Sequence, residues 1–524
     1  MHRLLIAGLS VMVIAAAPAA AANDAGQSVV LTLDAGKPGA TIDRHIFGQF
    51  AEHLGHGIYE GIWVGKGSKI PNTRGIRNDV VKALKALHVP DVRWPGGCFA
   101  DEYHWRRGIG PAGKRQAAVN SNWGGVVEPN TFGTDEFMDF IHQIGSEAYV
   151  SVNVGSGSPA EAAEWLEYMT SAPTDALGRE RARNGHKEPY KVAFIGLGNE
   201  SWSCGGSMSP DFYVSQMKLH ARFDRNFNPA QTMQRVAVGP SGGDTEYTEA
   251  VMKAWSKKDW SWGFEGLSLH NYTTGGGWPP VHKATGFGEN DYAVMLKDTL
   301  GMDDLIRKHA EIMDKYDPEK KVSLVVDEWG AWLAPTPGSN PGFLVQQNSQ
   351  RDAVLAALNL NIFARHADRV RMANIAQMIN VLQAMIQTDK KKMLLTPTYH
   401  VFRMYVPFQD ATFIPVAFDA GTYTFENISM PRVDAVAARD KAGKIWLAIT
   451  NLDPNKPAEF DIAATGMTAG RAVGETLSAP TIDSINTFGA PKTVAPKPIT
   501  AVAAGGKLVL TLAPASVTVV ALEP

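Results

Sequence analysis

The sequence predicts an α/β protein in which a (β/α)8 TIM barrel is followed by a C-terminal antiparallel β-sandwich. Between residues 44 and 407, short apolar and β-branched runs alternate with helical patterns, as parallel strands and crossover helices do. Eight such runs can be counted, which is the number of strands that closes this barrel. After Pro407 the helical patterns stop, and short strand-like runs separated by turn residues follow.

The barrel strand candidates are rich in valine, isoleucine and aromatic residues. They are Ile46–Glu52, Val89–Trp94, Ala148–Val154, Val192–Gly198, Val236–Gly239, Phe264–Leu269, Val322–Val326 and Arg371–Asn380. The helical stretches between them include Asn78–Leu87, Glu161–Met169, the one that follows Ser209-Pro210, Asp291–Tyr316 and Ser349–Ala367. Two of these begin with Ser-Pro, in which serine caps the helix and proline takes its first position. A doubly wound open sheet is the alternative, and the strand count and the lack of G-x-G-x-x-G argue against it.

The sandwich is predicted from the pattern after the barrel. Its expected strands are Val433–Arg439, Lys444–Asn451, Glu459–Ala463, Arg471–Leu477, Lys507–Leu512 and Ser516–Leu522. Asp440–Gly443 is a hairpin turn signal, and prolines between 478 and 498 predict a loop. Ser28–Leu33 precedes the barrel and is expected to complete the sandwich. The predicted domains are 23–43 for this N-terminal strand, 44–407 for the barrel and 408–524 for the sandwich.

Residues 1–22 predict a secretory signal peptide. A basic start precedes an apolar middle, and small residues stand at the position expected for cleavage. An uncleaved anchor is the alternative, and the shortness of the apolar run argues against it. We therefore expect an exported protein that is periplasmic or secreted.

The composition is ordinary for a globular protein, with 524 residues, 44% hydrophobic, 20% charged and a net charge of −3. No basic surface for nucleic acid or an anionic membrane is indicated, so neither partner is expected after signal cleavage. Cys98 and Cys204 leave two interpretations open, one disulfide or two buried thiols. Because no two cysteines lie close in sequence, no metal site is expected, and nothing indicates a cofactor.

Two glutamates follow predicted strands at the end where a barrel carries its chemistry. Glu200 follows the fourth strand in GLGNESW, and Glu328 follows the seventh in VVDEWGAW. Cleavage of a glycosidic bond requires such a pair, one carboxyl group to give a proton and one to act as nucleophile or base. Amide, histidine, tyrosine and tryptophan side chains follow other strands, and these groups bind sugar hydroxyls and the apolar face of a sugar ring.

The order of several motifs resembles that of the α-L-arabinofuranosidases of glycoside hydrolase family 51, which are retaining enzymes with a (β/α)8 barrel. The motifs are FGQFAEHLGHGIYEGIW (47–63), RWPGGCFADEYHW (93–105), GLGNESWSCGG (196–206), SLHNY (268–272), VVDEWGAW (325–332) and AQMINVLQAMI (376–386). The resemblance implies that Glu200 is the acid/base and Glu328 the nucleophile. The residues that it implies to hold the arabinofuranose are Glu52, Asn199, His270, Tyr272 and Gln377.

Three further residues are expected at the substrate site. Cys98 stands where many members of the family carry asparagine, and a thiol is a poorer hydrogen-bond partner than an amide. It is therefore expected to shape the pocket or to pair with Cys204. Trp123 and Trp202 are expected to form a platform for the leaving group, or else to pack under loops.

The resemblance implies an exo-acting enzyme that releases terminal arabinofuranose from arabinoxylan, arabinan or their oligosaccharides. Double displacement with retention predicts carboxyl groups ~5–5.5 Å apart. Two alternatives stay open: an endo-xylanase or endo-glucanase of the same clan, which needs an open cleft, and an inactive sugar-binding protein. The resemblance also suggests a homo-oligomer.

Overall fold

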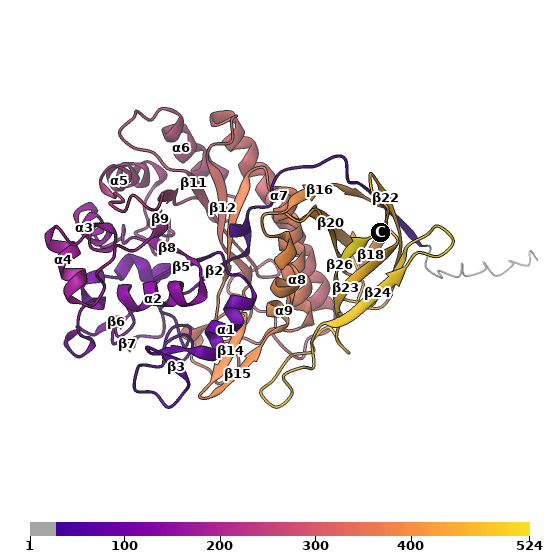
Figure 1. Ribbon diagram of the computed structural model, residues 1–524, viewed down its shortest axis with the longest axis horizontal. Helices are drawn as coiled ribbons and strands as arrows, with labels where there is room; N and C mark the ends of the chain where they lie inside the picture. The colour runs from indigo at the N-terminus through magenta and orange to yellow at the C-terminus, as the bar shows by residue number, and fades with distance from the viewer. Residues whose placement is uncertain (1–27) are drawn as a thin grey trace, which may run out of the picture.

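The computed structural model describes residues 28–524, so the predicted signal peptide lies outside the described part of the chain. A closed barrel of eight parallel strands lies beside a domain of two β-sheets (Figure 1). The barrel strands are β2 (Gly48–Phe50), β5 (Asp91–Trp94), β8 (Glu147–Ser151), β9 (Val192–Leu197), β10 (Gln234–Ala237), β11 (Gly266–Thr273), β12 (Ser323–Ala331) and β13 (Val370–Ala376). Each of them overlaps a predicted strand, and the predicted fold class is confirmed.

Two barrel strands continue beyond their apolar runs. The ladder between β11 and β12 extends through polar residues to the pair Thr273–Ala331, with a register shift between Ser268 and His270. Another shift in β12 falls between Val326 and Trp329. These irregularities re-aim side chains near the carboxyl ends of both strands. Apolar patterning could not predict this extension, because polar residues follow the apolar run of each strand, His270 and Asn271 in β11 and Asp327 and Glu328 in β12.

Nine α-helices of the described residues connect or follow the strands. They are α1 (Asn78–Ala86), α2 (Thr134–Ile144), α3 (Pro159–Thr170), α4 (Ala176–Arg183), α5 (Pro210–Phe223), α6 (Thr245–Ser256), α7 (Glu289–Tyr316), α8 (Gln350–Arg365) and α9 (Pro397–Met404). The predicted serine caps are present, because Ser158 accepts from the amide of Glu161 and Ser209 from that of Phe212. Among residues 28–524, no helix is both long enough and apolar enough to span a bilayer.

The second domain is a sandwich of a six-stranded and a four-stranded sheet. The larger sheet contains β16 (Thr412–Ile414), β20 (Val433–Arg439), β21 (Ile445–Asn451), β26 (Ser516–Glu523), β23 (Arg471–Leu477) and β24 (Lys497–Val502), and the smaller contains β17 (Val416–Ala417), β1 (Val29–Asp34), β22 (Ala458–Thr465) and β25 (Val509–Leu512). The pairs are antiparallel except that β1 runs parallel to β22. The N-terminal strand therefore completes the sandwich, as predicted.

In the part of the chain that the structure describes, four short hairpins form two-stranded sheets outside the barrel and the sandwich. They are β3–β4 (Asn72–Thr73 and Ile76–Arg77), β6–β7 (Ala118–Asn120 and Val126–Glu128), β14–β15 (Ile386–Asp389 and Lys392–Leu395) and β18–β19 (Thr422–Phe425 and Ile428–Pro431). Residues 120–123, at the turn of β6–β7, bring Trp123 towards the barrel mouth, where its indole nitrogen donates to Glu52. The hairpins were not predicted, because strands of two to four residues carry too few positions for a period to show.

Helix α8 joins the two domains. All of its residues from Gln350 to Ala364 are buried, and Figure 1 shows it between the barrel strands and the C-terminal sheets. Two of its polar side chains reach β20, since the Asn361 amide and the Arg365 guanidinium each donate to Asp434 at 2.8 Å. A helix that is buried on all sides must pack against neighbours on more than one face, and here the barrel covers one face and the sandwich another.

Replacing Leu358 by alanine tests the packing of α8. Leu358 is fully buried, so we expect Leu358→Ala to lower the free energy of unfolding by about 3 kcal/mol, because a cavity remains. Leu219→Ala on α5, whose side chain is 46% exposed, serves as the control and should cost less than about 1 kcal/mol. Urea unfolding followed by circular dichroism measures both. Equal losses in the two variants would contradict this account of the domain junction.

Candidate active site

The two predicted glutamates lie together at the carboxyl ends of β9 and β12. One carboxylate oxygen of Glu200 and one of Glu328 lie within 4.8 Å of each other and of a ring nitrogen of His270. In inverting enzymes the two carboxyl groups lie on opposite faces of the sugar, far enough apart for a water molecule to fit as well. The separation between Glu200 and Glu328 leaves no room for that water molecule. It suits an attack by one carboxylate itself.

The chain aims Glu200 through a tightly folded loop after β9. Glu200 has a φ of 36°, in the left-handed region. Gly205 follows, and a Cβ atom there would lie 1.8 Å from the carbonyl oxygen of Asn199. Only glycine therefore fits at 205 in the GNESWSCGG motif, and the strain at Glu200 is of the kind found where a side chain must be held in one direction.

Arg93 connects β12 with the segment that follows β9. Its side chain is 1% exposed, and it donates from Nη1 to Glu328 Oε1 at 2.8 Å and from Nη2 to Asn199 Oδ1 at 2.7 Å. The other oxygen of Glu328 accepts from the Tyr272 hydroxyl at 2.8 Å. Glu328 is thus held at both oxygens, and Asn199 is fixed beside it.

A second chain of contacts holds Glu200. His270 Nδ1 lies 2.9 Å from Glu200 Oε1, and His270 Nε2 lies 3.2 Å from Asp327 Oδ1. The Tyr149 hydroxyl donates to the other oxygen of Asp327 at 2.7 Å. Burial alone lowers the pKa of His270, but Glu328, Asp327 and Glu200 raise it to about 10. The ring is therefore an imidazolium near neutral pH, with one N–H for each carboxylate.

Sequence reasoning did not assign roles to Arg93 and Tyr149. Arg93 stands inside a buried strand, in the run DVRW, and a charged residue at such a position is rare unless it is paired. That rarity is the one signal that could have found it. Tyr149 gives no such signal, because a tyrosine in a strand is ordinary core.

Glu52 forms the other wall of the site with two predicted partners. Its Oε1 accepts from the Trp123 indole at 2.9 Å and from the amide of Phe99 at 3.1 Å, and its Oε2 accepts from Gln377 at 2.9 Å. Burial and the charge of Glu328 raise the pKa of Glu52 to about 7, although these three donors oppose the rise. Three residues from separate segments thus meet in one polar cluster, and their part in binding a sugar stays a prediction.

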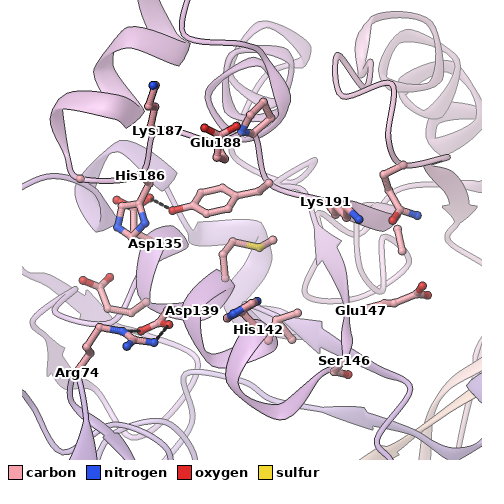
Figure 2. Close-up of a pocket in the computed structure, with 18 of the residues that line it drawn as sticks. Arg74, Asp135, Asp139, His142, Ser146, Glu147, His186, Lys187, Glu188 and Lys191 are labelled. Atoms are coloured by element: carbon pink, nitrogen blue, oxygen red, sulfur yellow. Dashed lines mark hydrogen bonds and ion pairs between the residues drawn. The ribbon is translucent and has the colours of Figure 1, made fainter.

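These groups surround a narrow pocket of about 60 Å³. Its lining includes Glu52, Gly97, Cys98, Trp123, Glu200, Tyr272, Glu328, Trp332, Leu344 and Gln377. A much larger cavity, of about 810 Å³, lies at the amino ends of β8 and β9 and is lined by charged side chains such as Lys191 and Glu147 (Figure 2). None of the predicted site residues lines that cavity. Paired carboxylates, and not size, therefore identify the functional pocket.

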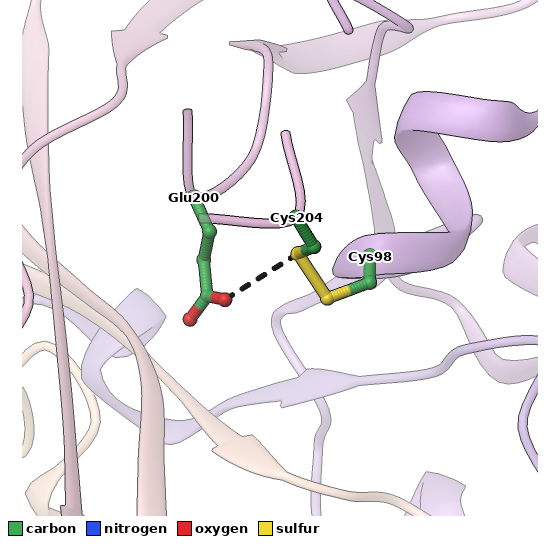
Figure 3. Close-up of side chains that lie close together, drawn as sticks. All are labelled: Cys98, Glu200 and Cys204. Atoms are coloured by element: carbon green, nitrogen blue, oxygen red, sulfur yellow. Dashed lines mark hydrogen bonds between the residues drawn. A yellow bond between two sulfur atoms is a disulfide. The ribbon is translucent and has the colours of Figure 1, made fainter. Parts of the chain in front are cut away.

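Cys98 and Cys204 form a disulfide, which settles the two interpretations that the sequence left open. Figure 3 shows it beside Glu200, with Cys204 Sγ 3.5 Å from Glu200 Oε2. Cys98 therefore lines the pocket as a disulfide, and it has no thiol to offer a sugar. Together with Glu200 the two sulfurs make one possible metal cluster, and Glu200, His270 and Glu328 make another. In the group of Cys98, Cys204 and Glu200, the two sulfurs are bonded to each other. In the group of Glu200, His270 and Glu328, His270 already contacts both carboxylates.

Trp202 is not among the residues that line the pocket. Its indole nitrogen donates to the carbonyl oxygen of Gly239 at 3.1 Å, and its ring packs against the core of the barrel. Of the two tryptophans expected at the substrate, the structure thus brings Trp123 to the pocket and packs Trp202 against the core of the barrel.

Comparisons with known proteins identify both halves of the chain. Residues 83–258 match the family model described as alpha-L-arabinofuranosidase 1 domain, and residues 327–516 match the alpha-L-arabinofuranosidase C-terminal domain. An intracellular exo-alpha-L-arabinofuranosidase of Bacteroides ovatus is 44% identical over 90% of this chain and 91% of its own. An intracellular exo-alpha-(1->5)-L-arabinofuranosidase of Acetivibrio thermocellus is 30% identical over 68% of this chain and 71% of its own.

Solved structures agree with the sequence relatives. The family 51 arabinofuranosidase of Xanthomonas axonopodis pv. citri has a TM-score of 0.92 and 49% identity, and the match covers 95% of this chain and 100% of that one. The Thermotoga maritima α-L-arabinofuranosidase, in its arabinose complex, has a TM-score of 0.80 and 29% identity over the same shares of the two chains.

The prediction of export is contradicted by these comparisons. Both bacterial relatives are named as intracellular enzymes, so the match gives no support to a periplasmic or secreted protein or to a signal peptide. That prediction rested on the basic start, the apolar middle and the small residues of the N-terminus.

The family follows from the combined evidence. The barrel and sandwich, the paired glutamates in a narrow pocket, and the long matches at 44% and 49% identity all point to the same assignment. The chain belongs to the α-L-arabinofuranosidases of glycoside hydrolase family 51.

Proposed function

We propose that the protein is an exo-acting, retaining α-L-arabinofuranosidase that releases terminal arabinofuranose from arabinoxylan, arabinan or their oligosaccharides. The observation that carries this proposal is the approach of Glu200 and Glu328 within 4.8 Å in a single pocket of about 60 Å³. Such a pocket favours one terminal sugar over a polymer chain, which would need an open cleft. The related enzymes with exo-acting names support the same choice.

Glu328 is the proposed nucleophile. Arg93 and Tyr272 each donate to a separate oxygen of its carboxylate, so the group keeps one orientation towards the anomeric carbon. Attack forms a glycosyl ester on Glu328 and releases the leaving oxygen, through a transition state with positive charge on the sugar ring. Pre-organised donors cost no rearrangement during this step.

Glu200 is the proposed acid and then base. Burial raises the pKa of Glu200. The hydrogen bond from His270 opposes this rise, and the negative charge of Glu328 adds to it. The raised pKa favours the protonated form of Glu200, which can give its proton to the leaving group. When Glu328 becomes an ester its charge is lost, the pKa of Glu200 falls, and Glu200 can take a proton from water.

The proposed sugar contacts are the polar groups around the pocket. Glu52 and Gln377 offer oxygen and nitrogen atoms to the hydroxyls, and Trp123 offers an apolar edge. Asn199, fixed by Arg93, is proposed to donate to the 2-hydroxyl of the sugar. A homo-oligomer and the domain division at 43/44 and 407/408 stay predictions, and analytical ultracentrifugation tests the first of them.

Substitution of the two glutamates tests their separate roles. Glu328→Ala should lose at least about 10⁴-fold in kcat on every arabinofuranoside, since no ester can form. Glu200→Ala should lose about 10²–10⁴-fold on a sugar leaving group and much less on 4-nitrophenolate, which needs no proton. Azide should restore turnover of Glu200→Ala and give the α-configured arabinofuranosyl azide.

The matched control is Glu249→Gln, an exposed carboxylate of α6 paired with Lys315, which should keep wild-type kinetics. A β-configured azide product would show inversion and refute double displacement. Near-normal turnover by Glu328→Ala would refute the nucleophile.

Glu52 is expected to make stability depend on pH. Its pKa is 4.5 in the unfolded chain and about 7 in the folded protein. Between these values the folded state binds the additional proton, so stability falls as pH rises, by up to about 3 kcal/mol. Urea unfolding near pH 4.5 and near pH 8 should show a smaller fall in Glu52→Gln than in the wild type. An unchanged difference would mean that Glu52 titrates normally.

A further inference from the structure

A disulfide stands beside the catalytic pocket, and the proposed mechanism gives it no part. Cys98 and Cys204 are the two cysteines of the chain, and they are bonded to each other. Cys98 lines the pocket, and neither cysteine is fully buried, so small molecules that enter the pocket can reach the sulfurs. A disulfide stabilises a fold wherever it closes a loop, and it needs no place in an active site for that purpose. Its position next to Glu200 therefore points to a part in the chemistry.

The disulfide joins two walls of the pocket. Cys98 follows β5 and precedes Phe99, whose amide donates to Glu52 at 3.1 Å. Cys204 lies four residues after Glu200, in the loop that follows β9. One covalent bond thus ties the segment that holds Glu52 to the loop that carries the acid/base.

The sulfur of Cys204 contacts both members of the Asn199-Glu200 pair. Glu200 Oε2 lies 3.5 Å from this sulfur (Figure 3), and the side-chain amide of Asn199 donates to it at 3.7 Å. The other oxygen of Glu200 faces His270 Nδ1 at 2.9 Å. A disulfide sulfur carries no hydrogen, so in its contact with Oε2 only the carboxyl group can hold a proton. The oxidised sulfur is therefore a suitable neighbour for an acid that must stay protonated.

Reduction places a hydrogen-bond donor at the same oxygen. One thiolate of a dithiol reagent bonds to one sulfur of the disulfide and releases the other cysteine. The second thiolate of the reagent then closes a cyclic disulfide and releases the first cysteine. The reagent loses two hydrogens, and Cys98 and Cys204 gain one each. The Cys204 S–H now faces Glu200 Oε2, and a hydrogen bond to a carboxylate favours its charged form and lowers its pKa.

We propose that the Cys98–Cys204 disulfide positions the acid/base, and that its reduction by thiols slows the hydrolysis of glycosides with sugar leaving groups. This inference rests on the proposed function. With the sulfurs bonded to each other, Glu200 keeps the proton that it gives to the leaving oxygen. With both sulfurs reduced, the Cys204 thiol stabilises the carboxylate, and the acid form of Glu200 becomes rarer. The enzyme is thus more active where disulfides persist than where cytosolic thiols reduce them.

Kinetics of the oxidised and the reduced protein test this inference. Dithiothreitol is the reductant, and a thiol titration should find none per chain before treatment and two after it. We expect reduction to lower kcat/KM on α-1,5-arabinobiose about tenfold near pH 8, because a weaker hold on the proton leaves less acid form. The basic limb of the pH profile should move to lower pH. A 4-nitrophenyl arabinofuranoside needs little proton donation and should lose less than about threefold. Reoxidation should restore both rates.

Two single substitutions separate the hydrogen bond from the covalent link. Cys98→Ala and Cys204→Ala both lack the disulfide, but only Cys98→Ala keeps a thiol beside Glu200. Cys98→Ala should therefore reproduce the pH profile of the reduced wild type, whereas Cys204→Ala should keep the basic limb where the oxidised wild type has it. Neither variant should respond to dithiothreitol, which controls for effects of the reagent elsewhere in the protein.

Three results would overturn this inference. Unchanged kinetics after two thiols have appeared would show that the disulfide has no part in the chemistry. The same pH profile in Cys98→Ala and Cys204→Ala would show that a thiol beside Glu200 has no effect. A disulfide that dithiothreitol does not open in the folded protein would show that thiols do not reach it. Failure of the oxidised wild type to hydrolyse either arabinofuranoside would instead refute the proposed function.

Discussion

The site depends on one buried cation. Arg93 donates to Glu328 and to Asn199, and its Nε lies 3.4 Å from Asp327. Strand β12 and the loop after β9 thus meet at a single guanidinium from β5, whose planar fork can satisfy several acceptors at fixed angles. Without Arg93, the buried carboxylates of Asp327 and Glu328 would lie close together, and only His270 would be left to balance their negative charge.

This arrangement is costly for the fold and useful for the chemistry. Arg93, Asp327 and Glu328 are all nearly fully buried, and removing charges from water costs more than a single ion pair returns. The raised pKa of Glu52, at about 7, is one sign of that cost. The large cores of barrel and sandwich, joined through α8, supply the stability that allows such a site.

Much of the fold and of the site could be predicted from sequence, for identifiable reasons. The barrel strands have apolar runs long enough to show, and Glu200 and Glu328 stand where such runs end. The strands of the hairpins are too short to show an alternation of apolar and polar residues. Helices α2 and α6 lack the Ser-Pro start that identified two of the other helices. The disulfide joins residues 106 positions apart, so no spacing could reveal it. Trp123 and Trp202 look alike in sequence, and tertiary packing alone separates them.

The proposed double displacement depends on the covalent role of Glu328. In Glu200→Ala, a 2,4-dinitrophenyl arabinofuranoside should form the glycosyl ester quickly and hydrolyse it slowly, because the base is missing. Mass spectrometry of a peptic digest should then find one added arabinosyl group on the peptide that contains Glu328. An adduct on Glu52 or on another residue, or no adduct despite turnover, would contradict the central claim.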